Sequence, residues 1–325
     1  MSTATVVPET RDLSGDDAWT TLRNTGRRRL VADAFTRMRV SDGFSHARSL
    51  ALMTTLVAIQ GVIAVVGLAA FVGGSGFPDM VAATIRTAVP GPAGQALTAA
   101  VAHAHATGAQ HRYPAVVLGT IGTLFTATTA FGQLERALNR LYGVEQDRPT
   151  LEKYGRAFVL AITAGTAVAL SFVSLALGRD LLVKVAGGTL STLWNWLRWP
   201  LGVILTAGAV TATLKHCPRR RQPRLSWLAF GSTIAVVGTA IVTVALGAFF
   251  RTSRSFGQTY GPLAGMVALM LWAMLSAMAL IFGAAVAAQL EGVRSGAAQP
   301  QDQEKVAESE PTSGHDRLPH PVGAQ

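Results

Sequence analysis

A row of polar side chains runs from the inside of an apolar segment, 114–132, to just beyond its end, and these residues are the best placed in the sequence to do chemistry. The row consists of Thr126, Thr129, Gln133, Glu135 and Asn139. Glu135 and Asn139 are four residues apart, so a helix would place both on one face. Hydroxyl, amide and carboxylate groups here would line an opening for an ion or an anionic solute. In the alternative interpretation, the threonines bond their own helix and the charged residues form a solvated turn.

Three further candidates belong to the last apolar segment, 263–289, and its flanks. Gln289 and Glu291 lie at its end, and Tyr260 precedes its start. The order of the segments predicts that Gln289 and Glu291 reach the same end of the molecule as Glu135, where they would share one opening. Tyr260 has two interpretations. Gly261 and Pro262 after it are typical of a turn that enters a helix, and the alternative is a gate or a contact with substrate.

The sequence contains no convincing enzyme site. The histidines of the segment 87–110 and its end, His103, His105 and His111, lack the spaced carboxylate partners of a metal site. Cys217 is the only cysteine, which excludes a disulfide framework. Its basic neighbours would either lower the pKa of the thiol or serve only to set the topology of the chain. No P-loop, dinucleotide fingerprint or nucleophile with an adjacent base is present. We therefore predict no catalytic residue, no cofactor and no metal.

Composition places these residues in a membrane protein. Half of the residues are hydrophobic and only 14% are charged, whereas a soluble domain has about a quarter. Six apolar segments are candidates to cross a hydrocarbon core of about 30 Å. They are 50–72, 114–132, 157–178, 199–214, 225–249 and 263–289. The predicted fold is all-α, a polytopic membrane bundle of about six transmembrane helices.

The basic residues predict the orientation of the bundle. Lys and Arg total 28, and the segments between the apolar runs alternate between many and few of them. Such an alternation predicts that both termini are cytoplasmic, and it explains the net charge of +10 without a nucleic-acid partner. The helix predicted at 93–106 would lie on the outer face or be partly re-entrant, because a full crossing would break the alternation.

The prediction divides the chain into three parts: 1–48, 49–291 and 292–325. The first holds a basic amphipathic helix whose arginines would attract anionic lipids of the inner leaflet, at roughly 1 kcal/mol each. These arginines are Arg27, Arg28, Arg29, Arg37 and Arg39. The alternative is a helix that only directs topology. The middle part is the six-span domain, and the polar tail should be disordered. The sequence leaves open whether the chain forms a homo-oligomer or binds a partner in the cell envelope.

Residues 224–291 resemble the YihY/BrkB family of bacterial inner-membrane proteins. The landmarks are Trp227, Gly231, Ser255, Tyr260-Gly261, Leu263, Trp272, Gly283 and Leu290-Glu291. Residues 122–149, with Leu138-Asn139 and Gly143-Val144, and residues 45–60 are similar to the family's second and first spans. The resemblance implies about six spans and a transport or envelope role. It also brings a ribonuclease label for some members, which no cluster of metal ligands supports here.

One position departs from the family. The resemblance implies an acidic residue in the last span, where this chain has Ala285. An intramembrane carboxylate is costly and normally functional, so its absence affects any activity that depends on it. The function predicted is transport or export of a small solute, an ion or a lipid-related molecule. The alternative is a non-transporting scaffold of the cell envelope. Five glycines should let the helices approach: Gly119, Gly122, Gly165, Gly238 and Gly283.

Overall fold

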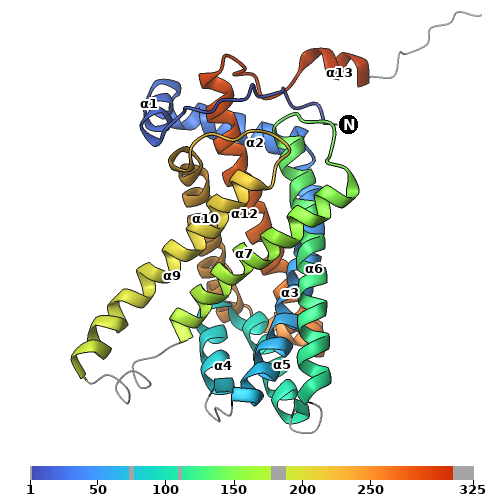
Figure 1. Cartoon of the computed structure of the whole chain (residues 1–325), viewed down its shortest axis with the longest axis vertical. Helices are drawn as coiled ribbons and strands as arrows, with labels where there is room; N and C mark the ends of the chain where they lie inside the picture. Colours follow the sequence, from blue (N-terminus) through green and yellow to red (C-terminus); the bar gives the residue numbers. More distant parts are fainter. Residues whose placement is uncertain (1, 73–76, 109–111, 177–187, 310–325) are drawn as a thin grey trace, which may run out of the picture.

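The computed structural model describes residues 2–72, 77–108, 112–176 and 188–309, and these ranges are built from helices (Figure 1). The long helices are α3 (Gly43–Val72), α6 (Arg112–Leu141), α7 (Thr150–Ala176), α9 (Gly188–His216), α10 (Leu225–Thr252) and α12 (Ala264–Arg294). The shorter helices are α1 (Gly15–Thr25), α2 (Arg27–Val40), α4 (Phe77–Ala88), α5 (Gly91–Gly108), α11 (Arg254–Tyr260) and α13 (Gln303–Ser309). The all-α prediction is confirmed.

Over their described residues, five of the long helices are apolar enough to cross a membrane: α3, α7, α9, α10 and α12. The prediction had six such spans, and the described residues of α6 are not apolar enough to count as the sixth. It has 30 residues, as many as α3, but its row of threonines and Gln133 lower its hydropathy. The fourth span, predicted as the short segment 199–214, is part of a much longer helix that includes the tryptophans before it.

Two glycines bring α10 and α12 into backbone contact. A Cβ atom on Gly231 would lie 2.7 Å from the carbonyl oxygen of Gly283, and a Cβ atom on Gly283 would meet the carbonyl oxygen of Gly231. Ala235 and Ala287, each four residues further along, border the same contact. Small residues four apart allow this approach in membrane helices, where close packing rather than water exclusion holds helices together.

The other predicted glycine contacts are confirmed except one. Gly119 and Gly122 on α6 pack against Ala64 and Gln60 of α3, and Gly238 on α10 packs against α12. Gly165 on α7 was predicted wrongly, because a Cβ atom there would meet nothing within 4 Å.

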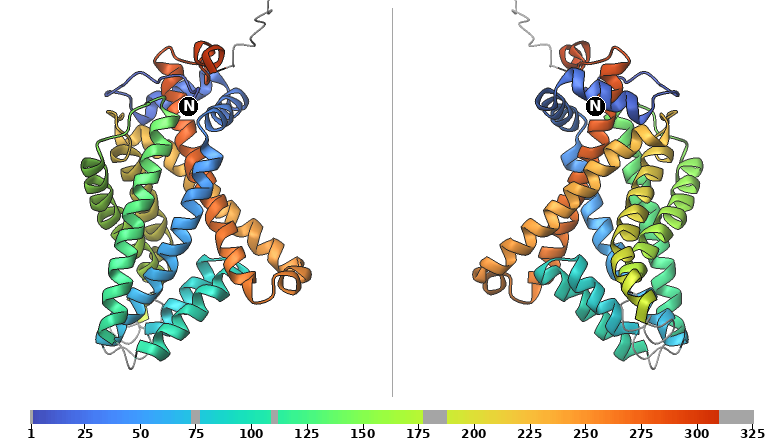
Figure 2. Two further views of the ribbon diagram at one scale, coloured as in Figure 1. Left: turned by 90° about the vertical axis from the view of Figure 1, so that its right-hand side faces the viewer. Right: turned by 90° about the vertical axis from the view of Figure 1, so that its left-hand side faces the viewer.

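Helices α4 and α5 form a hairpin that enters the bundle and returns to the same end (Figures 1 and 2). The turn between them places Gly91 at φ +51° against the ring of Phe250, close to the end of α10. From this turn α5 packs against Ala58–Val62 in the middle of α3 and against Leu269 of α12. The helix predicted at 93–106 is therefore confirmed, and it packs against α3 and α12.

The two described ends of the chain meet at the opposite end of the bundle (Figure 1). Ala4 forms a β-bridge with Gln301, the amide of Thr5 donates to Pro300, and the amide of Asp302 donates to Thr3. The prediction that the whole tail 292–325 is disordered is wrong for residues 292–309, which are the end of α12, a bonded segment and α13. The prediction relied on the low hydropathy of the tail, whereas main-chain hydrogen bonds rather than apolar burial hold this segment in place.

Candidate functional site

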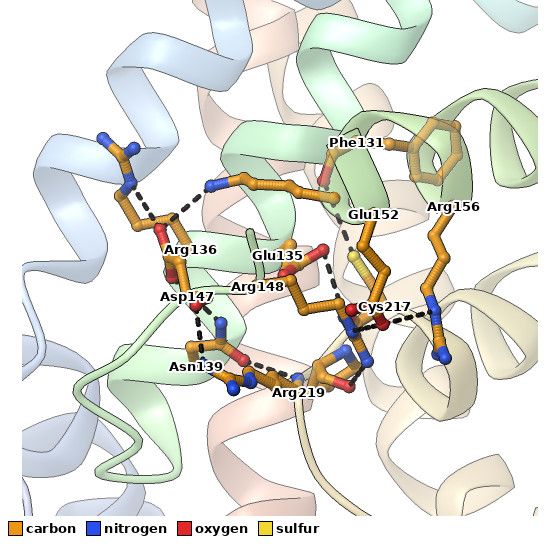
Figure 3. Close-up of polar contacts among 12 residues, drawn as sticks. Phe131, Glu135, Arg136, Asn139, Asp147, Arg148, Glu152, Arg156, Cys217 and Arg219 are labelled. Atoms are coloured by element: carbon orange, nitrogen blue, oxygen red, sulfur yellow. Dashed lines mark hydrogen bonds and ion pairs between the residues drawn. The ribbon is translucent and has the colours of Figure 1, made fainter. Parts of the chain in front are cut away.

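The end of α6 carries a buried ion pair at the centre of a polar cluster, shown in Figure 3. Glu135 Oε2 lies 3.1 Å from Arg148 Nη1, and both side chains are almost inaccessible to solvent. Arg148 also donates to the carbonyl oxygens of Cys217 and Pro218, at 2.8 and 2.7 Å. Its Nε lies 3.4 Å from Glu152. The guanidinium therefore links the residues that follow α9 to the end of α6 and to the first turn of α7.

Asn139 lies one turn beyond Glu135 and joins the same cluster to the loop after α9. Its Nδ2 donates to Asp147 at 3.0 Å, and its Oδ1 accepts the amide of Arg219 at 2.7 Å. Asp147 also accepts hydrogen bonds from Lys153 and Arg136, at 2.9 and 3.1 Å. We call this group of residues the α6–α7 cluster: Glu135, Arg136, Asn139, Asp147, Arg148, Glu152, Lys153 and Arg219.

Asp147 makes the stability of this cluster depend on pH. Burial disfavours its charged form, but hydrogen bonds from Asn139 and Lys153 outweigh burial and lower the pKa of Asp147 from 3.8 to about 2. The carboxylate therefore stabilises the fold above pH 3.8, and this contribution is lost as the pH falls through about 2.

Asp147→Asn should lower the Tm of the full-length protein at neutral pH, and the difference from the unmodified protein should shrink as the pH falls from 3.8 to about 2. Thermal unfolding in an acid-stable detergent measures it. The control is Asp16→Asn, because Asp16 is exposed on α1. A Tm difference that stays constant over this range would contradict the role given to Asp147.

The end of α12 carries the second buried ion pair. Arg220 donates to both oxygens of Glu291, at 2.9 and 2.8 Å, and the two side chains are 2% and 0% exposed. Thr10 Oγ1 donates to Glu291 Oε1 at 2.6 Å, and the guanidinium of Arg220 lies 4.3 Å from the ring centre of Tyr142. Two parallel N–H···O bonds are the strongest arrangement of such a pair.

Arg37 of α2 lies buried beside this pair. Its Nε donates to Gln289 Oε1 at 2.8 Å, and its Nη1 donates to the carbonyl oxygens of Thr5 and Leu141, both at 3.0 Å. Burial lowers the pKa of Arg37 to about 10, so it remains charged at neutral pH. The predicted lipid contact of Arg37 is therefore wrong. We call Arg37, Arg220, Gln289 and Glu291 the α12 cluster.

The loop between α9 and α10 joins the two clusters through consecutive residues. Arg219 contacts the α6–α7 cluster, and Arg220 contacts the α12 cluster. The predicted pairs thus reach the same end of the bundle, and arginine side chains or amides bind both pairs. Sequence reasoning treated Arg148 and Arg220 only as topological charges. The run Arg219-Arg220-Arg221 between two spans was the available signal.

The remaining predicted residues lie outside both clusters. Thr126 donates to Gln60 of α3 at 2.9 Å, and Thr129 donates to the carbonyl oxygen of its own helix at Phe125. Gln133 is half-buried on α6. Tyr260 is exposed, and its ring lies against that of Phe256 in a tilted arrangement. It comes before α12 begins and therefore lies at the other end of that helix from Glu291. It belongs to the turn in which Gly261 has φ +50°.

The remaining candidates for enzyme chemistry do not form a site in the described part of the chain. Cys217 is buried, and burial raises the pKa of its thiol, which opposes the lowered value that its basic neighbours would suggest. Among the described residues no group of three or more His, Cys, Asp and Glu could hold a metal ion. His103 and His105 lie on α5, and His111 lies outside the described residues.

Comparisons with known proteins give a consistent assignment. The family model described as virulence factor BrkB matches residues 34–309. A UPF0761 membrane protein of Rhodospirillum rubrum is 29% identical over 81% of this chain and 60% of its own length. A Bacillus subtilis protein with a ribonuclease-like name is 24% identical over 53% of this chain and 64% of its own. The alignments thus cover less than two thirds of these relatives, and no solved structure matches.

Proposed function

The chain belongs to the BrkB family of integral membrane proteins, and we propose that it carries a small solute, an ion or a lipid-related molecule across the bacterial inner membrane. The two clusters would be the closed gate on the cytoplasmic side. One observation supports this proposal above all: two buried ion pairs hold separate segments together at one end of the bundle.

The chemistry of the closure suits a gate. The Arg220–Glu291 pair joins residues 71 apart in the sequence, and Arg148, besides its pair with Glu135, binds the carbonyl oxygens of Cys217 and Pro218 beyond α9. Removing the ions of such a pair from water costs several kcal/mol, so apolar packing of similar volume would be at least as stable. A closure made of ion pairs can separate into two solvated halves, because each half regains hydration when it opens. Apolar packing offers no comparable compensation. The gate would open by parting Arg220 from Glu291 and Arg148 from Glu135.

The proposal includes six spans, with α6 as the sixth. The described ends of the chain meet at one end of the bundle, which requires an even number of crossings. On α6, Leu118, Ile121 and Phe125 are strongly exposed, as expected for a lipid-facing stripe. Its threonines largely bond carbonyl oxygens of their own helix, which reduces their polarity. The end with the two clusters would be cytoplasmic, because most basic residues gather there.

Access of water to Ala285 tests the gate. Ala285 is completely buried on α12, one turn before Gln289 of the α12 cluster. In a Cys217→Ser background, Ala285→Cys should react with a membrane-impermeant maleimide when the gate opens. Adding Arg220→Gln should increase the labelling rate about tenfold or more, since a weakened pair of this kind favours the open state. Arg23→Cys, an exposed position on α1, is the labelling control.

Transport itself requires a flux measurement. Proteoliposomes with the full chain and a trapped pH-sensitive dye would be exposed to gradients of K⁺, chloride and phosphate. The rival function, an envelope scaffold, is favoured by the way both chain ends are bonded into the α12 cluster. A scaffold predicts no protein-dependent flux and no labelling of position 285 in folded protein. That combined result would replace the transport proposal.

An enzymatic role is not part of the proposal. Glu135, Asp147 and Glu291 each bind arginine or lysine side chains, so these carboxylates are engaged in structure. The ribonuclease-like name belongs to the Bacillus subtilis relative. Incubating the purified full chain with labelled RNA, with and without divalent cations, tests this exclusion, and cleavage that co-purifies with the folded protein would contradict it.

A further inference from the structure

Helix α2 has an exposed apolar face beside the face that packs on the bundle. Leu30, Ala34 and Met38 are buried in the core. Val31 and Phe35, by contrast, are 52% and 50% exposed. Residues four apart are neighbours on a helix, so Val31 and Phe35 form one continuous apolar stripe. Figure 1 shows α2 lying across the end of the bundle, roughly at right angles to the long helices.

This stripe adjoins the start of α3. The ring of Phe35 lies against the ring of Phe44, with centroids 5.9 Å apart and an edge-to-face geometry. Phe44 is in the first turn of α3, which then enters its membrane span. Leu52 and Leu56 further along α3 are exposed, as expected for lipid-facing residues. Phe44 therefore joins the apolar stripe of α2 to α3, on a face of α3 where the exposed Arg48 comes one turn before Leu52.

Arginines border the exposed stripe. Arg27 and Arg28 precede Val31 by four and three residues, and Arg39 follows Phe35 by four, so all three lie along it. Their side chains are exposed. Arg29 lies on the other flank, where it pairs with Asp33 at 3.7 Å.

We propose that the stripe and its three arginines form a binding site for anionic phospholipid headgroups. Val31 and Phe35 would enter the boundary between headgroups and acyl chains, while Arg27, Arg28 and Arg39 bind phosphate oxygens. An apolar stripe bordered by cations on a helix in the membrane plane is the arrangement that binds anionic lipid surfaces. Each arginine should strengthen binding about fivefold. The site does not depend on the gate or on transport.

The test measures lipid binding to the purified full-length protein. After delipidation in a nonionic detergent, the protein is titrated with phosphatidylglycerol or phosphatidylcholine, and bound lipids are counted by native mass spectrometry. Phosphatidylglycerol should bind more tightly. The variant R27Q/R28Q/R39Q should lose at least about tenfold in phosphatidylglycerol affinity. The matched control R23Q/R221Q/R224Q removes three exposed arginines outside α2 and should retain the preference. Equal losses in the two variants would overturn the proposal.

A second measurement covers the case in which the triple variant does not fold. In the Cys217→Ser background, Phe35→Cys is labelled with bimane and the protein is placed in nanodiscs containing phosphatidylglycerol. Lipids with a nitroxide near the headgroup should quench the bimane fluorescence strongly, and aqueous iodide should quench it weakly. The reverse order would show that α2 faces water, and the site would be wrong.

Discussion

Gly283→Val should prevent the accumulation of folded protein. A Cβ atom at this position would meet the carbonyl oxygen of Gly231 and approach the amide nitrogen of Ala235 to 2.9 Å. These are backbone atoms and cannot rotate away, so α10 and α12 must separate. Overpacking a core costs about 1–3 kcal/mol when side chains can adjust, and a backbone contact should cost at least the upper value. Fluorescence-detected size-exclusion chromatography of the full chain measures the monodisperse yield.

Gly165→Val is the matched control for this prediction. Gly165 is also in the interior of a membrane helix, α7, but a Cβ atom there would meet nothing within 4 Å. The valine should therefore leave the yield close to that of the unmodified protein. Gly231→Val should resemble Gly283→Val, because the contact is reciprocal. Full yields for both α10–α12 variants would show that these helices do not cross at this point.

Arg220→Met should lower the Tm more than any substitution of an exposed arginine. It leaves the carboxylate of Glu291 completely buried, with Thr10 as its remaining side-chain partner. Breaking a buried pair on one side costs about 3–5 kcal/mol. Glu291→Leu should cost a similar amount, because it leaves the guanidinium of Arg220 buried without its acid. Thermal unfolding of the full-length protein in detergent measures both variants.

The double variant Arg220→Met/Glu291→Leu should be more stable than either single variant, because it removes both charges together. Arg221→Met is the control, since Arg221 is exposed and should change stability by less than about 0.5 kcal/mol. The double variant also separates stability from gating. In the proposed transporter it should fold but show reduced flux, because an apolar closure lacks the hydration gained on opening. Additive losses of stability in the double variant would contradict the buried pair.

The helical bundle was largely predictable because its signals are local. The length and hydrophobicity of the apolar segments predicted five of the long helices with the right character, and Gly91–Gly108 contains the whole of the helix predicted at 93–106. The glycine pattern predicted close contacts that the structure shows at Gly119, Gly122, Gly238 and Gly283. Each of these predictions depends on a property of a short segment, which neighbouring helices change little.

The partners of the charged residues were not predictable in this way. Glu135, Asn139, Gln289 and Glu291 were placed correctly at one end of the bundle, but as the lining of an opening. The structure instead shows that Arg148, Arg219, Arg220 and Arg37 bind them. Arg37 looked like a surface arginine of an amphipathic helix until the packing of α2 buried it.

By itself, then, the sequence determined a membrane bundle of long helices, their close contacts and the end at which the polar residues gather. Only the tertiary structure decided which charges pair, and that residues 2–10 and 297–302 close this end. The physical reason is that insertion of a helix into a membrane depends on the summed hydrophobicity of consecutive residues. An ion pair such as Arg220–Glu291 depends instead on where packing brings segments 71 residues apart.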